Sequence, residues 1–255
     1  MVKYKHIIQA IEEDINKSHQ HLLIPKTVEK TFDKFHKETC GEHISKKEHY
    51  ISSNNQGDIQ TIIHGDEDSV PIDWIGACQH YDETGEPLHD THNHPRNGQK
   101  VCAECLSPKD IDNLFLKYDG SEFFDEPLYD EPVYPFKSTS CESANSTRMT
   151  LVRGDKFNPK NEKKAHKLGV KLEKYWSDYY DEYYSYANRI ASKTTIDEWK
   201  KIMKDDTLTY EEYNKYIHAQ TIKKVGVFEQ NKEFKDIQKE FRSLDCRLSY
   251  KHIKE

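Results

Sequence analysis

The sequence lacks long hydrophobic runs. None of its apolar stretches approaches the roughly 18 consecutive residues that a membrane-spanning helix requires. Residues 1–12 also lack the apolar core of a secretory signal, so we expect none. Charged residues make up 33% of the chain and hydrophobic residues only 35%. We therefore expect a polar cytoplasmic protein with no membrane partner, or a virion-associated one if the chain is viral.

Signals for several other classes of protein are also sparse. The formal net charge of −7 argues against a general nucleic-acid-binding surface, which needs an excess of Lys and Arg. Six cysteines are too few and too scattered for a disulfide framework at this length. The sequence contains no Gly-rich phosphate loop, no Gly-x-Ser-x-Gly nucleophile elbow and no internal repeat. Nothing therefore points to a nucleotide-dependent enzyme, a serine hydrolase or a repeat protein.

The most informative motif is His92-Asn93-His94-Pro95. Two histidines at positions i and i+2 of an extended segment point to the same side, because side chains alternate across a strand. Downstream, Ser107-Pro108-Lys109-Asp110 is typical of a helix start, with an N-cap serine, a proline at the first helical position and an acidic residue at the third. Asp110 would then face the histidines. Two imidazoles and one carboxylate leave a fourth position open, as in a catalytic zinc site.

A simpler interpretation of these residues remains open. Ser107 and Asp110 could serve only to cap a helix, and the two histidines could be surface residues beside a proline turn. We favour the metal site because the Ser-x-x-Asp pattern follows the histidines in the order that such a site requires.

The order His-x-His-Pro, a linker and then Ser-x-x-Asp resembles the motif of the JAMM (JAB/MPN-type) zinc metallopeptidases. That family also carries a glutamate on an earlier strand. Glu48 fits best, because it opens a predicted strand at 48–53 that is followed by a turn signal at 54–57 and a second strand at 59–63. This order is similar to the JAB-type domains found beside phage and archaeal-virus head proteins. The resemblance covers residues 40–155, under half of the chain.

Two other glutamates compete with Glu48 for the role of the family glutamate. Glu42 and Glu38 also precede the strand, but Lys46 and Lys47 separate Glu42 from its apolar residues. Glu48 is therefore the stronger candidate.

The resemblance implies a reaction and a role for each residue. His92, His94 and Asp110 would hold Zn²⁺, and a water with its pKa lowered to about 7 would take the fourth position. Glu48 would accept the proton of that water and deliver it to the leaving amine. Ser107 would donate a hydrogen bond to the oxyanion. The reaction would be hydrolysis of a peptide or isopeptide bond in a protein or peptide substrate.

Two other functions fit the same resemblance. The chain could be a catalytically silent structural or assembly module of a virus head, with its helical tail as the interaction surface. It could also be similar to the RadC-type proteins, which share His-x-His-Pro and whose activity the motif does not settle. Retention of every motif element favours the enzyme, because a scaffold needs none of them.

One departure from the family pattern concerns the linker. Twelve residues separate His94 from Ser107, more than the usual compact loop, and they include Cys102 and Cys105. These two cysteines are reduced bystanders, a redox pair or half of a second structural zinc site. A four-cysteine site would need partners, for which the candidates are Cys78 and Cys141.

The expected fold is α+β, with a JAB/MPN-like mixed sheet, flanking helices and a C-terminal helical region. We expect an N-terminal helical segment at 1–38, the catalytic domain at 39–157 and the helical region at 158–255. An apolar seam at helical spacing supports the last of these, with Leu172, Trp176, Tyr179, Tyr183, Tyr186 and Ile190.

The helical region is rich in tyrosine and contains two capping boxes. Thr195 with Glu198, and Thr209 with Glu212, predict two helix starts. More than half of the 16 tyrosines lie between residues 175 and 216. Tyrosine combines an apolar ring with a polar hydroxyl, which suits an interface that is partly exposed to water. We therefore expect these helices to pack on the catalytic domain, to self-associate or to bind a protein partner.

Overall fold

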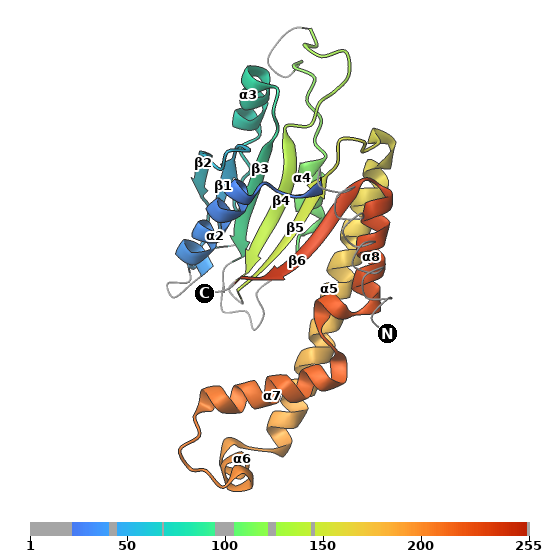
Figure 1. The fold of residues 1–255 in the computed structure, drawn as a ribbon. Coiled ribbons are helices and arrows are strands. Elements are labelled where there is room, and N and C mark those ends of the chain that lie inside the picture. The colour runs from blue at the N-terminus through green and yellow to red at the C-terminus, as the bar shows by residue number, and fades with distance from the viewer. Residues whose placement is uncertain are drawn as a thin grey trace, which may run out of the picture. The chain divides into compact units, whose positions relative to one another are not determined.

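The predicted α+β class is confirmed. The computed structural model contains a six-stranded mixed sheet, helices around it and a helical region toward the C-terminus (Figure 1). Within its described residues, no helix has the combination of length and apolar character needed to cross a membrane. The structure describes residues 22–40, 45–67, 69–94, 105–121, 126–143 and 146–253.

The chain divides into two compact units. One comprises residues 1–170 and 238–255, and the other comprises residues 171–237. This division differs from the predicted one, because the end of the chain returns to the unit that holds the sheet. The predicted N-terminal helical segment at 1–38 lies partly outside the described residues, and its described part ends in a helix that packs on the sheet.

The sheet has the strand order β2-β1-β3-β4-β5-β6, and only β3 and β4 are parallel neighbours. All residues of β5 and all but the last of β3 are buried. Strands that are buried on both faces need cover from both sides. The strands are β1 (His49–Ser53), β2 (Ile59–His64), β3 (Leu88–His94), β4 (Phe136–Ser143), β5 (Thr147–Arg153) and β6 (Cys246–His252).

Helices supply that cover on the two faces. Helix α2 (Lys26–Cys40) packs Phe32 and Phe35 against Ile51 of β1. Helix α4 (Pro108–Leu114) lies on the other side of the sheet, next to β4 (Figure 1). Because side chains alternate across a strand, Tyr50 points away from α2, and so does His92, its partner on β3.

One helix has no counterpart in the sequence-based predictions. Helix α3 (Trp74–Thr84) begins after Asp73, whose side chain accepts a hydrogen bond from the Gly76 amide, and ends at Gly85 with φ of 70°. An N-cap aspartate and a left-handed C-terminal glycine are local signals for a helix. Asp73 and Gly85 can both be recognised in the sequence as possible helix ends. The residues between them show no clear apolar periodicity, so the sequence did not predict this helix.

A group of charged side chains is buried beneath α2. Glu142 of β4 and Arg148 of β5 are 0% and 1% exposed, and Nε of Arg148 donates to the Glu142 carboxylate. Nδ1 of His36 lies 3.0 Å from the second oxygen of that carboxylate, and Thr91 donates to the first at 3.1 Å. Arg148 also pairs with Asp33 at 2.8 Å. These contacts join α2 to the centre of the sheet.

The prediction of helix throughout 158–255 is wrong at its end. Helix α8 (Lys232–Ser243) stops, and β6 then pairs with β5 in an antiparallel ladder along its whole length. Cys246 and Leu248 of β6 are buried in the core. The partner of this strand lies about a hundred residues earlier in the chain, so helical spacing could not reveal the pairing.

This pairing makes the end of the chain necessary for the sheet. A chain that ends at Pro159 would leave the hydrogen-bonding groups of β5 unpaired and uncover the core beside Leu248. We expect its thermal midpoint to fall by roughly 10 °C or more, if the lost burial amounts to about 3 kcal/mol or more. Circular dichroism against temperature measures this, with a chain ending at Ile253, which keeps all of β6 and the buried Ile253, as the control. An unchanged cooperative transition would contradict the pairing.

The unit of residues 171–237 is helical. Both predicted capping boxes form, at Thr195 before α6 and at Thr209 before α7. Trp199, Tyr213 and Ile217 form its buried cluster. Its elements are α5 (Glu162–Lys193) from Lys171 to its end, α6 (Ile196–Met203), α7 (Tyr210–Val225), a short 3-10 turn (Phe228–Gln230) and the start of α8.

The tyrosines of this unit have different environments. Tyr175 and Tyr179 are buried, and their hydroxyls donate to the backbone carbonyls of Phe228 at 2.9 Å and Gly226 at 3.0 Å. Tyr210, by contrast, is 65% exposed. Part of the tyrosine content is therefore explained by packing, and self-association or partner binding through these helices stays a prediction.

Candidate metal centre

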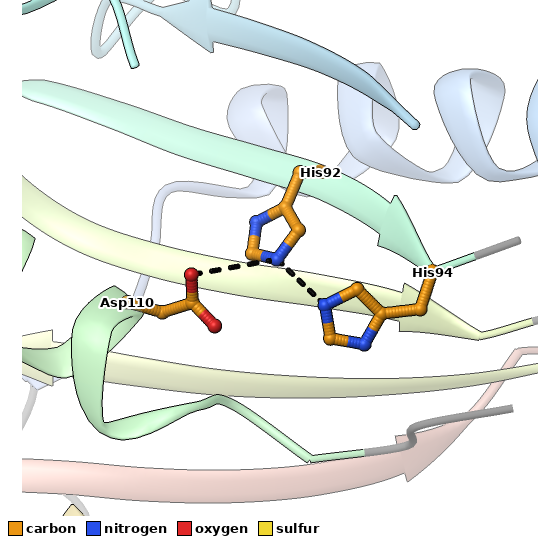
Figure 2. A group of neighbouring side chains, drawn as sticks. All are labelled: His92, His94 and Asp110. Atoms are coloured by element: carbon orange, nitrogen blue, oxygen red, sulfur yellow. Dashed lines mark hydrogen bonds and ion pairs between the residues drawn. The ribbon is translucent and has the colours of Figure 1, made fainter. Parts of the chain in front are cut away.

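The three predicted metal ligands come together at the end of β3. His92 and His94 project to one side of the strand, toward Asp110 in the first turn of α4 (Figure 2). Their Nε2 atoms are 2.9 Å apart, and Nε2 of His92 is 3.7 Å from Oδ1 of Asp110. One potential ligand atom from each residue lies within 4.8 Å of the others. Two nitrogens bound to one tetrahedral Zn²⁺ would be about 3.3 Å apart, so a shift of a few tenths of an ångström between the imidazoles would fit an ion.

The start of α4 orients Asp110. Its Oδ2 accepts a hydrogen bond from the Ser107 amide at 2.8 Å, and its own amide donates to the Ser107 hydroxyl at 3.2 Å. This reciprocal capping box leaves Oδ1 toward His92, so Asp110 presents one oxygen to the site. The Ser107 hydroxyl accepts through a lone pair, and its proton is available for another acceptor. The predicted cap and the predicted ligand are therefore compatible.

Glu48 lies beside these three residues. Tyr50 and His92 are directly opposite each other in the β1–β3 ladder, so continuing that register by two residues sets Glu48 opposite His94. Backbone hydrogen bonds hold Glu48 to the loop after β2, since its amide donates to the Asp66 carbonyl at 2.7 Å and its carbonyl accepts from Gly65 at 2.9 Å. Opposite residues on one face of a sheet are close enough to interact.

The environment of Glu48 suits a base more than a surface carboxylate. Burial raises the pKa of Glu48 above its ordinary value. The charge of His94 and the Val70 amide act in the opposite direction, but the negative charges of Asp110 and Asp66 add to the effect of burial. A carboxylate with a raised pKa binds a proton more readily, which general-base catalysis needs.

The pKa of Asp110 is shifted in the opposite direction. Burial alone would raise its pKa, but His92, His94 and the hydrogen bonds from Ser107 outweigh burial and lower the pKa below its ordinary value. Asp110 therefore keeps its ionised form more readily, as a metal ligand would need to, whereas Glu48 more readily takes up a proton. A bound divalent cation would lower the pKa of both carboxyls, because its charge favours their ionised forms.

Close packing around the second strand helps to place Glu48. A Cβ atom at Gly65 would lie 2.2 Å from the Ser69 carbonyl oxygen, so only glycine fits there. The close approach brings Val70 to the carboxylate of Glu48, which accepts a hydrogen bond from its amide. In the sequence, this contact corresponds to Gly65 and then Ser69-Val70, which follow the second predicted strand in that order.

The possible second metal site at Cys102 and Cys105 stays a prediction, because one of its two residues is not described. Cys102 lies outside the described residues, and Cys105, Cys141 and Cys78 are buried and form no disulfide. Burial raises the pKa of the Cys141 thiol well above its ordinary value, and Cys105 adds to the effect. In the part of the chain that the structure describes, only the His-His-Asp group has side chains spaced as metal ligands.

Comparisons of this chain with protein-family models, with curated proteins and with solved structures found no match. The residues and geometry of this centre are therefore the basis on which a function can be proposed for the protein.

Proposed function

We propose that this protein is a zinc-dependent hydrolase of peptide or isopeptide bonds with a JAMM-type site. The observation that carries the proposal is the ligand group itself, two imidazoles and one carboxylate within 4.8 Å, with a further carboxylate beside it. Three protein ligands leave a coordination position for water, as catalytic zinc sites do and structural ones do not.

Each residue then has a separate chemical task. His92, His94 and Asp110 would hold the ion, which when bound supplies an acidified water and polarises the substrate carbonyl. Glu48 would accept the proton from that water and pass it to the leaving nitrogen. The Ser107 hydroxyl, whose proton is not used in the capping box, would donate to the developing oxyanion.

Metal analysis tests the proposal. Purified protein should contain at least one zinc per chain, and replacing His92 and His94 together by alanine should remove it, because two of three ligands are lost. Inductively coupled plasma mass spectrometry measures the metal. The matched control is the double replacement His166→Ala with His218→Ala, which removes two exposed imidazoles that do not belong to the clustered ligands.

Zinc that persists in the His92 and His94 double variant would refute this ligand set and direct attention to the cysteines. A protein that binds no zinc would favour the alternative of a silent assembly module, since such a module has no need of metal. If the enzyme is correct, capture with a Glu48→Gln variant, which should bind substrate without cleaving it, would identify the substrate.

A further inference from the structure

Asn93 is the residue between the two histidines, and it is fully buried. Its side chain does not join them at the metal centre, because alternate residues of a strand point to opposite faces. Its Oδ1 accepts a hydrogen bond from the His49 amide at 2.5 Å, and its Nδ2 donates to the Lys47 carbonyl at 3.1 Å. These two backbone groups are the ones on either side of Glu48.

The two hydrogen bonds extend the contact between β1 and β3. The ladder between these strands runs from Ser53 opposite His89 to Tyr50 opposite His92 and ends there. Beyond that point, the described contacts of the Glu48 backbone are with the loop after β2. The Asn93 carboxamide is therefore the link that ties the backbone around Glu48 to the strand that carries both histidines.

The chemistry of the link is specific to a carboxamide. One side chain must accept from an amide and donate to a carbonyl, and Asn provides an acceptor oxygen and a donor nitrogen at that reach. The partners also fix which atom is which, because Nδ2 could not accept the His49 proton. An aspartate in its place would keep the acceptor and lose the donor.

We propose that Asn93 is a positioning residue, which holds Glu48 at the distance from the metal that proton transfer requires. This inference depends on the proposed function, because it assigns Asn93 a part in the same site. Proton transfer depends on hydrogen-bond reach, so loosening the segment around Glu48 would impair its action without removing a metal ligand.

Hydroxamate binding to the cobalt-loaded full-length protein tests this without a known substrate. Acetohydroxamic acid loses its hydroxyl proton when it chelates a metal, and a carboxylate beside the metal can take that proton. Cobalt absorption in the visible range reports both metal loading and hydroxamate binding. The variants are Asn93→Ala, Asn93→Asp and Glu48→Gln.

The control is Thr91→Ala. Thr91 is also buried, lies on the same face of β3 as Asn93, and donates to Glu142 rather than to the backbone around Glu48. The control therefore removes a buried hydrogen bond of the same strand and leaves the link to Glu48 intact.

We expect Glu48→Gln and Asn93→Ala each to weaken hydroxamate binding by about 10-fold or more, the usual scale for a hydrogen bond to a charged group. Both variants should still take up cobalt, because all three clustered ligands are kept. Asn93→Asp should bind hydroxamate with intermediate affinity, since it keeps one of two hydrogen bonds. Thr91→Ala should bind like the wild type.

The outcomes separate the two proposals. If Glu48→Gln weakens binding and both Asn93 variants bind like the wild type, Asn93 does not position Glu48. If Asn93→Ala does not fold, the same comparison with Asn93→Asp decides. Hydroxamate binding that is unaffected by Glu48→Gln, or a wild type that takes up no cobalt, would overturn the proposed function itself.

Discussion

Replacing Glu48 by glutamine should reduce hydrolysis by a factor on the order of 10² or more and leave zinc in place. Glutamine has nearly the same shape and can still hydrogen-bond, but it cannot accept a proton at neutral pH. Glu48 is not one of the three clustered ligands, so the metal should remain. Release of new amino groups from peptide probes and from lysine-linked isopeptide probes measures the rate, and metal analysis measures the zinc.

The control for this variant is another glutamate changed in the same way. Glu38 lies on α2 with its side chain 63% exposed and pairs with Lys34, so Glu38→Gln should be nearly silent. Glu42→Gln should also be nearly silent, although Glu42 lies outside the described residues. If Glu42→Gln is inactive and Glu48→Gln is active, the base lies six residues earlier than we propose. Full activity of both variants would rule out this mechanism.

Replacing Arg148 by methionine should lower the free energy of unfolding by about 3 kcal/mol or more. The Glu142 carboxylate is 0% exposed, and loss of Arg148 would remove the guanidinium that neutralises it. His36 and Thr91 would still contact the carboxylate, but methionine offers neither a charge nor a hydrogen-bond donor in place of the guanidinium. Urea denaturation at neutral pH measures the change.

Two further variants test whether the unpaired buried charge of Glu142 causes this loss of stability. Lys34→Met removes a cation from an exposed pair with Glu38 and should cost no more than about 1 kcal/mol. Arg148→Met combined with Glu142→Leu should be more stable than Arg148→Met alone, because no buried charge is left without its partner. Equal stability of Arg148→Met and the wild type would show that the buried cluster does not hold α2 to the sheet. Zinc content should not change, since the cluster and the metal centre are on opposite faces of the sheet.

Some local features of this structure could be predicted from the sequence, because they depend on groups that are close together in the chain. The capping box of Ser107 and Asp110 needs only residues three positions apart, and it forms as the spacing predicts. The boxes at Thr195 and Thr209 form for the same reason. The alternation of a strand likewise placed His92 and His94 on one side. In each case the interacting groups are neighbours in the chain, so residue type and spacing are sufficient.

Contacts between distant segments were decided only by the tertiary structure. The pairing of β6 with β5 joins residues about a hundred positions apart, which no local period encodes. The β1–β3 register, continued two residues beyond its last pair, sets Glu48 opposite His94, and it lets Asn93 reach the backbone on both sides of Glu48. The sequence by itself determined which side chains could ligate a metal and how Asp110 is held. Whether a further carboxylate stands beside them depended on strand register, which is set by packing across the whole sheet.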